Sequence, residues 1–239
     1  MGLERKPFVK LSGLGTRINT PQTRDLISRL NLAAITVLNN KNDVLPLHPD
    51  LKEAAILNVG KPEEIEPFDH KMKKYTSFAR FQLRKDLPEA EQQKLRDSLA
   101  AYRRVIVTVT EQRLASYQSF FAKFAPESPV IYVFYTPAKS MLQIQRAVSA
   151  AEAVVLAHAS RDDVQERVAD LLFGKATADG RLSASIGGLF PTGSGVTITP
   201  HTPFHFVPEE YGMKSEVLRR IDTIALELSL IHISEPTRQ

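Results

Sequence analysis

The chain has 239 residues, 43% of them hydrophobic, and its 31 basic and 27 acidic residues give a formal net charge of +4. The charges are scattered and no basic stripe carries interleaved aromatic residues, so nucleic-acid binding is not indicated. The absence of cysteine excludes disulfides, thiolate catalysis and cysteine-ligated zinc. The longest apolar runs are far shorter than the roughly 20 residues of a membrane-spanning helix, and the N-terminus shows no apolar segment typical of a signal peptide.

The first 60 residues are predicted to hold a linker, a helix and a strand. Residues 1–23 are basic and show no sustained periodicity, which is typical of a linker. Thr20 or Thr23 can cap a helix that extends to Val37 and is closed by residues 39–43. Its apolar positions would share one face: Leu26, Ile27, Leu30, Ala33, Ala34 and Val37. The sequence KEAAILNVGKP then predicts a central strand that ends at Gly60.

Residues 61–102 are predicted to form a polar segment, an edge strand and a helix. Residues 61–74 carry an acidic run followed by a basic run, the composition of a solvated helix or loop. The sequence YTSFARFQL alternates like a short edge strand, and LPEAEQQKLRDSLAAY is typical of a helix.

Three apolar runs then organise the rest of the chain: RRVIVTVT, PVIYVFYTP and AEAVVLAHAS. They are rich in β-branched and aromatic residues and apolar at alternating positions on both sides, which indicates central strands of a parallel sheet buried on both faces. Between them, EQRLASYQSFFAKFAPES and AKSMLQIQRAVSAAE repeat apolar residues three and four apart, as crossover helices do. The pattern predicts an α/β fold, a three-layer α/β/α sandwich with a mostly parallel sheet and flavodoxin-like winding.

A last helix is predicted in the sequence RDDVQERVADLLFGKATADGRL. Its inward positions would be Val164, Val168, Leu171, Leu172 and Phe173. Gly174 is placed to cap it in the left-handed conformation, and the pair Asp179–Gly180 predicts a tight turn.

Candidate site residues follow two of the predicted strands, where ligands bind in open α/β sheets. Glu111 comes directly after the first apolar run, either as an acid/base group or as a helix first-turn acid beside the helix dipole. His158 ends the last run, with Ser160, Arg161 and Asp162 close behind. These residues could bind sugar hydroxyls, or His158 could be hydrogen-bonded within its own loop beside Asp162 as a helix N-cap.

Neither a metal nor an organic cofactor is expected. His201 and His205 are four residues apart, but Pro203 between them denies the helix that would bring both onto one face. The glycines form neither G-x-G-x-x-G nor the phosphate-loop pattern, so no nucleotide is indicated.

Two phrases resemble the C-terminal domain of family 3 glycoside hydrolases. AAITVLNNKNDVLPL is similar to the opening of that domain, and LLFGKATADGRL is similar to the phrase near its end. The resemblance covers roughly residues 24–190. It departs from the family pattern at Asn39, at Ser183, where proline is usual, and at YTPAKS, where many relatives have a glycine-rich turn.

A second resemblance follows the first. PEEYGMKSEVLRRIDTIALE is similar to the start of a serine-hydrolase domain of the β-lactamase type, but the S-x-x-K nucleophile motif is absent from this chain. The expected organisation is a linker from a missing barrel (1–23), the family 3 domain (24–190), a linker (191–207), a truncated hydrolase-like segment (208–228) and a foreign tail (229–239).

The resemblance implies a sugar-cleaving parent protein. Family 3 enzymes are retaining glycosidases whose nucleophile lies on an N-terminal (β/α)8 barrel, which this chain lacks. In the β-glucosidase branch the proton donor is a glutamate of the C-terminal domain, for which Glu111 is the candidate here. In the N-acetylglucosaminidase branch it is a histidine on a barrel loop, and the hydrolase-like segment favours this branch. The parent is expected to be periplasmic or secreted, and the alternative function is an independent small-ligand-binding module.

Overall fold

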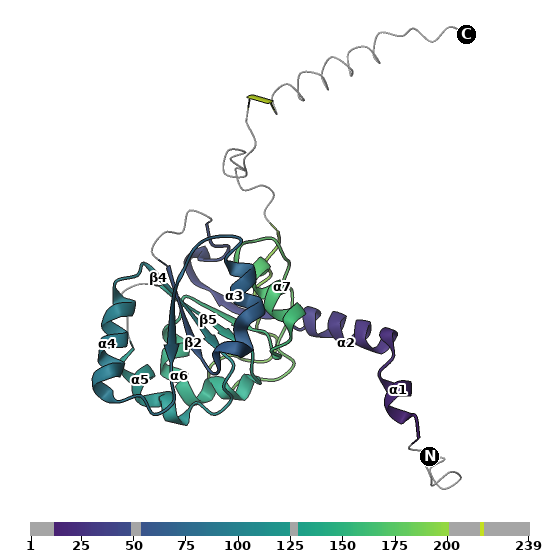
Figure 1. Ribbon diagram of the computed structural model, residues 1–239, viewed down its shortest axis with the longest axis horizontal. Helices are drawn as coiled ribbons and strands as arrows, with labels where there is room; N and C mark the ends of the chain where they lie inside the picture. The colour runs from purple at the N-terminus through teal and green to yellow at the C-terminus, as the bar shows by residue number, and fades with distance from the viewer. Residues whose placement is uncertain (1–11, 49–53, 125–128, 201–215, 218–239) are drawn as a thin grey trace. The chain divides into compact units, whose positions relative to one another are not determined.

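The computed structural model describes residues 12–48, 54–124, 129–200 and 216–217 (Figure 1). The chain divides into two units, Met1–Pro200 and His201–Gln239, and the fold described below is that of the first. Apart from residues 216–217, the hydrolase-like segment and the foreign tail lie outside the described residues, as do His201 and His205. They stay predictions.

A six-stranded sheet forms the middle layer, with strand order β1-β6-β5-β4-β2-β3. All neighbouring strands pair in parallel except β1, which is antiparallel to β6. The predicted α/β class and mostly parallel sheet are therefore confirmed. The strands are β1 (Thr36–Asn40), β2 (Ala54–Val59), β3 (Ala79–Leu83), β4 (Arg104–Val109), β5 (Val130–Phe134) and β6 (Ala153–Leu156).

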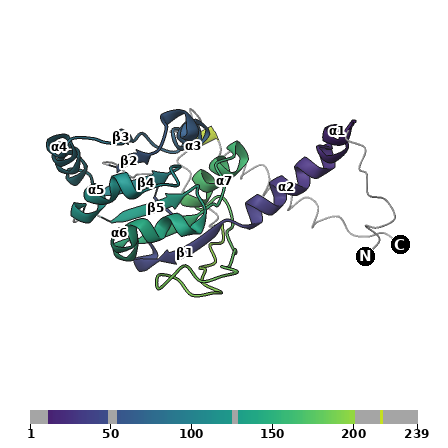
Figure 2. The ribbon, with the colours of Figure 1, turned by 90° about the horizontal axis from the view of Figure 1, so that it is seen from below.

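Helices cover both faces of this sheet (Figures 1 and 2). The α-helices are α1 (Leu14–Ile18), α2 (Pro21–Ala33), α3 (Glu66–Met72), α4 (Glu89–Ala100), α5 (Gln118–Lys123), α6 (Gln145–Ala150) and α7 (Asp162–Leu172). Short 3-10 helices are η2 (Lys41–Asp43), η3 (Pro62–Ile65), η4 (Ala115–Tyr117) and η5 (Ala138–Ile144). Each of the two predicted crossover helices is a 3-10 turn followed by a six-residue α-helix, η4 with α5 and η5 with α6.

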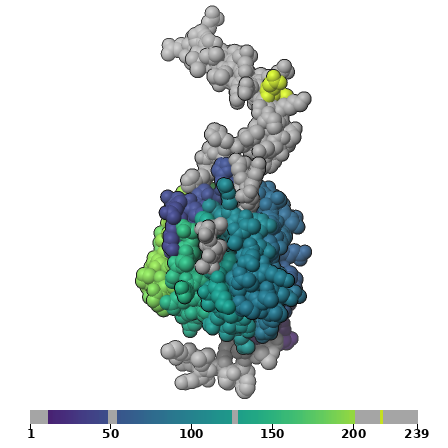
Figure 3. Space-filling view, turned by 90° about the vertical axis from the view of Figure 1, so that its left-hand side faces the viewer, coloured from purple at the N-terminus to yellow at the C-terminus, as the bar shows by residue number. Residues whose placement is uncertain are grey.

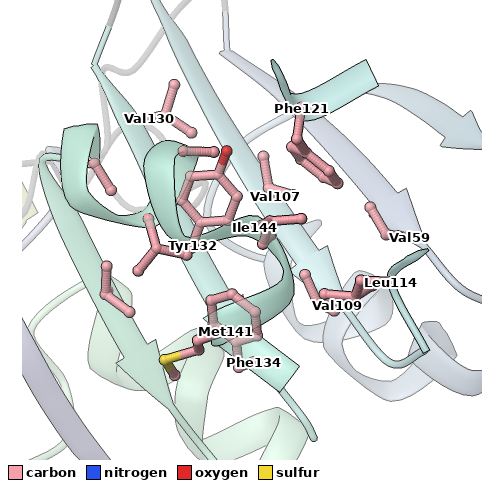
Figure 4. Packing of buried hydrophobic residues seen from close by; sticks show 14 of the residues in the cluster. Val59, Val107, Val109, Leu114, Phe121, Val130, Tyr132, Phe134, Met141 and Ile144 are labelled. Carbon is pink, nitrogen blue, oxygen red and sulfur yellow. The ribbon is translucent and has the colours of Figure 1, made fainter. Parts of the chain in front are cut away.

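Two hydrophobic layers result, one on each face of the sheet. Side chains of α4, α5 and α6 pack on one face around an aromatic group that includes Phe121, Tyr132 and Phe134 (Figure 4). On the other face, α3 and α7 pack over Ile56, Ile106 and other central residues. Strands β2, β5 and β6 are buried throughout, and β4 is buried after its first residue, because both faces of these central strands are covered.

The predicted N-terminal helix is wrong at its C-terminal end. It begins where expected, with the Thr20 side chain accepting a hydrogen bond from the backbone N–H of Thr23, but it ends at Ala33. The following β-branched residues Ile35, Thr36 and Val37 favour a strand, and they are buried at the start of β1. Strand β1 continues to Asn40, so residues 39–43 do not close a helix.

The charged segment 61–74 is less solvated than predicted. It forms η3 and α3, and it buries Ile65, Phe68 and Met72 in the layer shared with α7. Its charged residues alternate with these apolar residues at helical spacing. The segment is therefore amphipathic, which its charged composition did not indicate.

The C-terminal arm, residues 175–200, packs back along β1. Val196 pairs with Val37, and Ala178 pairs with Ile198. In Figure 3 this light-green arm lies beside the dark-blue residues near β1. The predicted division at residue 190 therefore falls within a segment that pairs with the domain, and it stays a prediction.

Gly174 and Gly180 are needed for different structural reasons. Gly174 follows α7 with a φ of 66°, the left-handed cap that was predicted. The turn predicted at Asp179–Gly180 is wrong. Gly180 instead lies so close to the start of β1 that an added Cβ would be 2.5 Å from the carbonyl oxygen of Ile35. The glycine is needed for close packing of two backbones.

We expect Gly180→Ala to lower the free energy of unfolding by about 1–3 kcal/mol, because neither backbone can easily yield to the new methyl group. Gly188→Ala is the matched control, since an added Cβ there meets nothing within 4 Å, and it should change stability by less than about 0.5 kcal/mol. Urea denaturation of both variants measures the difference. Equal stability of the two variants would contradict the packing role.

Candidate functional site

The parallel register aligns the carboxyl ends of four neighbouring strands. Val59, Val109, Phe134 and Leu156 are paired across β2, β4, β5 and β6. The residues that follow them therefore share one edge of the sheet, the edge at which open α/β sheets bind ligands. The predicted candidates Glu111 and His158 both lie there, but β4 and β6 are two strand spacings apart, about 10 Å.

Glu111 is engaged in its own loop. Its carboxylate accepts a hydrogen bond from the backbone N–H of Arg113 at 2.9 Å, and its own backbone N–H donates to the carbonyl of Val59. It precedes η4 by several residues, so it is not the first-turn acid of a helix. Its proposed role as an acid/base group stays a prediction.

His158 occupies a strained turn at the end of β6. Its φ is 63°, a left-handed conformation that is uncommon for residues other than glycine. The backbone N–H of Ala159 donates to the carbonyl of Ala157 at 2.7 Å, which closes a three-residue turn around it. Neither ring nitrogen makes a hydrogen bond within the described residues, so the predicted bond inside its loop is not found there.

The surroundings of His158 favour the neutral form of its imidazole. Its side chain is exposed, yet the protein around it removes enough water to lower its pKa. A neutral ring offers one donor and one acceptor, which suits contact with a hydroxyl or an amide.

Arg161 and Asp162 are arranged differently from the prediction. Arg161, not Asp162, holds the N-cap position of α7, and its side chain does not cap the helix. Its guanidinium pairs with Asp163 at 3.1 Å, while Asp162 is exposed in the first turn. The structure thus joins Arg161 to Asp163 and leaves Asp162 out of the N-cap position that was predicted for it.

Asp163, which the sequence did not single out, ties α2 to α7. One of its carboxylate oxygens accepts a short hydrogen bond from the hydroxyl of Ser28 on α2. Burial alone would raise its pKa, but the bonds from Ser28 and Arg161 hold that pKa below its usual value. This carboxylate is ionised at pH 7 and its contacts are structural.

A polar ladder crosses the sheet beneath η3 and α3. The hydroxyl of Thr108 donates to the side-chain oxygen of Asn58 at 3.3 Å, and the Asn58 amide donates to Gln82 at 2.9 Å. The Gln82 amide in turn donates to the carbonyl of Gly60 at 2.7 Å. The ladder joins β4, β2 and β3 and satisfies most of these buried polar groups.

Asp69 and Tyr135 lie beside this ladder. Asp69 pairs with Arg80 at 2.6 Å through one oxygen. Its other oxygen and the hydroxyl of Tyr135 are both buried without a hydrogen-bond partner in the described part of the chain. Burial raises the pKa of Asp69, although the positive charge of Arg80 acts to lower it. Burial, together with the negative charge of Asp69, raises the pKa of Tyr135 well above its usual value.

A cavity of about 200 Å³ opens between the ladder and α3. It is smaller than the roughly 300–1,000 Å³ of sites for drug-sized ligands, and its lining polar groups mostly bind one another. Its lining includes Ile56, Asn58, Asp69, Arg80, Phe81 and Gln82. This arrangement fixes the edge strand β3 rather than presenting a reactive group.

The sequence carried only a partial signal for these residues. Asn58 and Thr108 interrupt apolar strands, and polar residues inside such runs indicate buried hydrogen bonds. The ion pair of Asp69 and Arg80 could not be predicted from the sequence, because it depends on the parallel pairing of β2 with β3.

Neither a metal site nor a membrane span is found in the part of the chain that the structure describes. No cluster of three or more histidine, aspartate or glutamate side chains could hold an ion there. No helix in the same ranges is long and apolar enough to cross a membrane.

Comparison with solved structures shows the same fold in larger proteins. A β-glucosidase from Listeria innocua, solved with isofagomine, is 15% identical, with a TM-score of 0.54 over 77% of this chain and 30% of its own. A fungal multi-domain GH3 β-N-acetylglucosaminidase is 16% identical, with a TM-score of 0.54 over 81% of this chain and 22% of its own. No protein-family model and no curated protein matches the chain. The chain thus spans less than a third of the length of these proteins.

We expect His158→Gly to leave the protein at least as stable, because glycine adopts a positive φ without the penalty of about 1–2 kcal/mol that other residues carry. His158→Val should lower the free energy of unfolding by at least about 1 kcal/mol, since a β-branched residue fits this conformation worst. Thermal and urea unfolding measure both. A stable valine variant would show that the turn relaxes without cost.

Removal of two buried hydroxyls should have different effects on the stability of the protein. Tyr135→Phe deletes an unpartnered hydroxyl, so we expect unchanged or slightly higher stability. Thr108→Val removes the donor to Asn58 and should cost about 1–3 kcal/mol, because a buried acceptor loses its partner. Urea midpoints compare the two variants, and a large loss on Tyr135→Phe would reveal a hydrogen bond to that oxygen.

Proposed function

We propose that this chain is the C-terminal α/β domain of a larger family 3 glycosidase and that it does not cleave glycosidic bonds alone. The observation that carries the proposal is the coincidence of two family-like phrases with structural roles at opposite ends of one domain. The first phrase forms β1 and the turn after it. The second ends α7 and places Gly180 against β1. The fold shared with longer glycosidases supports the proposal.

The lack of activity follows from what a retaining mechanism needs. Two carboxyl groups must stand about 5–5.5 Å apart, one as nucleophile and one as acid/base. At the carboxyl-end edge of this sheet, Glu111 binds the backbone of its own loop, and Asp163 is held by Arg161 and Ser28. The nucleophile is proposed to lie on an N-terminal (β/α)8 barrel of the parent chain.

For the parent we favour substrates of the β-N-acetylhexosaminide type. The hydrolase-like phrase at residues 208–227 supports this branch, and one of the structurally similar proteins is a β-N-acetylglucosaminidase. In this branch the resemblance assigns the proton donor to a barrel histidine, so Glu111 would be dispensable. His158 and Arg161 would then contact the barrel or the sugar from the edge of the sheet.

The alternative function, an independent small-ligand module at the same edge, has less support. Thr136, which follows β5 at this edge, is buried and bonded to the hydroxyl of Ser140 at 2.6 Å. It is therefore not available to a ligand.

We expect the isolated chain to hydrolyse neither aryl β-N-acetylglucosaminides nor aryl β-glucosides. In the parent protein, Glu111→Gln should change kcat by less than about threefold, because loss of a true general acid costs about 10²–10⁴. Glu166→Gln, the same replacement at an exposed position of α7 outside the candidate site, is the control. Turnover by the isolated chain that disappears in Glu111→Gln would overturn the proposal, and a large loss in the parent would assign it to the β-glucosidase branch.

A further inference from the structure

Helix α2 exposes an apolar stripe on a part of the molecule that is otherwise polar. The side chains of Leu26, Ile27 and Leu30 are 47%, 41% and 60% exposed, and Ile18 of α1 is 54% exposed. These four account for most of the exposed large hydrophobic residues of the described chain. Single exposed leucines are common, but residues grouped on one helical face indicate an interaction surface.

The opposite side of α2 anchors it to the domain. The hydroxyl of Ser28 is bonded to Asp163 at the start of α7, and Leu32 packs on the core layer of α3 and α7. At 100° per residue, Leu32 lies about 40° around the helix from Ser28, whereas Leu26 and Leu30 lie about 160° away. The helix is thus held by one face, and its exposed apolar stripe lies on the other. Figure 2 shows the course of α2 away from the sheet past α7.

The small size of the stripe restricts what can cover it. Three aliphatic side chains supply much less than the roughly 800 Å² per partner of a stable protein–protein interface. A segment of the same polypeptide needs far less area, because a tether raises its effective concentration to the millimolar range. The longer proteins that share this fold have more than two thirds of their length outside it, and α2 directly precedes β1 on the N-terminal side of the domain.

We propose that the stripe of Leu26, Ile27 and Leu30 is the surface on which the upstream catalytic part of the parent chain docks. This inference rests on the proposed function, since it requires a folded domain upstream. The docking partner presents an apolar patch of matching size, and α2 is a rigid spacer whose orientation is fixed by Ser28 and Leu32. Contact with the stripe sets the position of the sheet edge that carries His158.

The test compares two double variants of α2 in the parent protein and in the isolated chain. Leu26→Gln with Leu30→Gln removes the stripe, and Arg24→Gln with Arg29→Gln changes exposed positions outside it. Glutamine is a good helix former at all four positions. We expect the stripe variant of the parent to be cleaved in residues 1–20 by trypsin about tenfold faster, because two buried leucines contribute at least that factor to the docked state. The control variant should be cleaved in residues 1–20 at the rate of the unchanged parent, since its replaced arginines lie outside that segment.

Stability and association of the isolated chain separate docking from folding. Both variants should unfold at the same urea concentration as the unchanged chain, since all four residues are exposed, and the unchanged chain should be monomeric by light scattering. Equal cleavage of the stripe and control variants would overturn the docking surface while leaving the proposed function intact. A dimer of the isolated chain that the stripe variant abolishes would assign the stripe to a second copy instead. A parent without a glycosidase domain upstream would overturn both proposals.

Discussion

Burial of both faces of the parallel strands is the constraint on which the rest of the domain depends. Strands β2, β4, β5 and β6 are covered on each side, so each needs helices above and below, and each connection between parallel strands must cross a face of the sheet. The short η4–α5 and η5–α6 segments supply this cover on one face, with large buried side chains such as Phe120 and Phe121 packed on the strands. The same parallel pairing brings the ends of the strands to one edge, so Glu111 and His158 lie on the same edge although β5 separates their strands.

The sequence predicted the interior well and the periphery less well. Central strands are recognisable because apolar residues on both alternating positions have no other stable environment. The start of β1 was misread as helix because leucines and alanines upstream continue at helical spacing, and the change at Ile35 depends on pairing with β6, far along the chain. Tertiary pairing decided this element against the local pattern.

The candidate site shows the same division. Residues at strand ends could be placed from the sequence, because the end of a buried run marks the edge of a sheet. Their partners could not be placed, since Arg161 binds Asp163, and Asp163 also binds Ser28 on a helix more than a hundred residues away. The polar ladder of Asn58, Gln82 and Thr108 likewise needs three strands in register before any of its bonds can form.

The bridge between Val37 and Val196 has a mechanical consequence. Where the polypeptide enters the domain and where it leaves are joined side by side on one edge strand, β1. Tension applied through flanking segments would load this antiparallel contact first, and the five parallel strands behind it would bear little of the force. The core of the sheet would therefore stay unstretched under such a load.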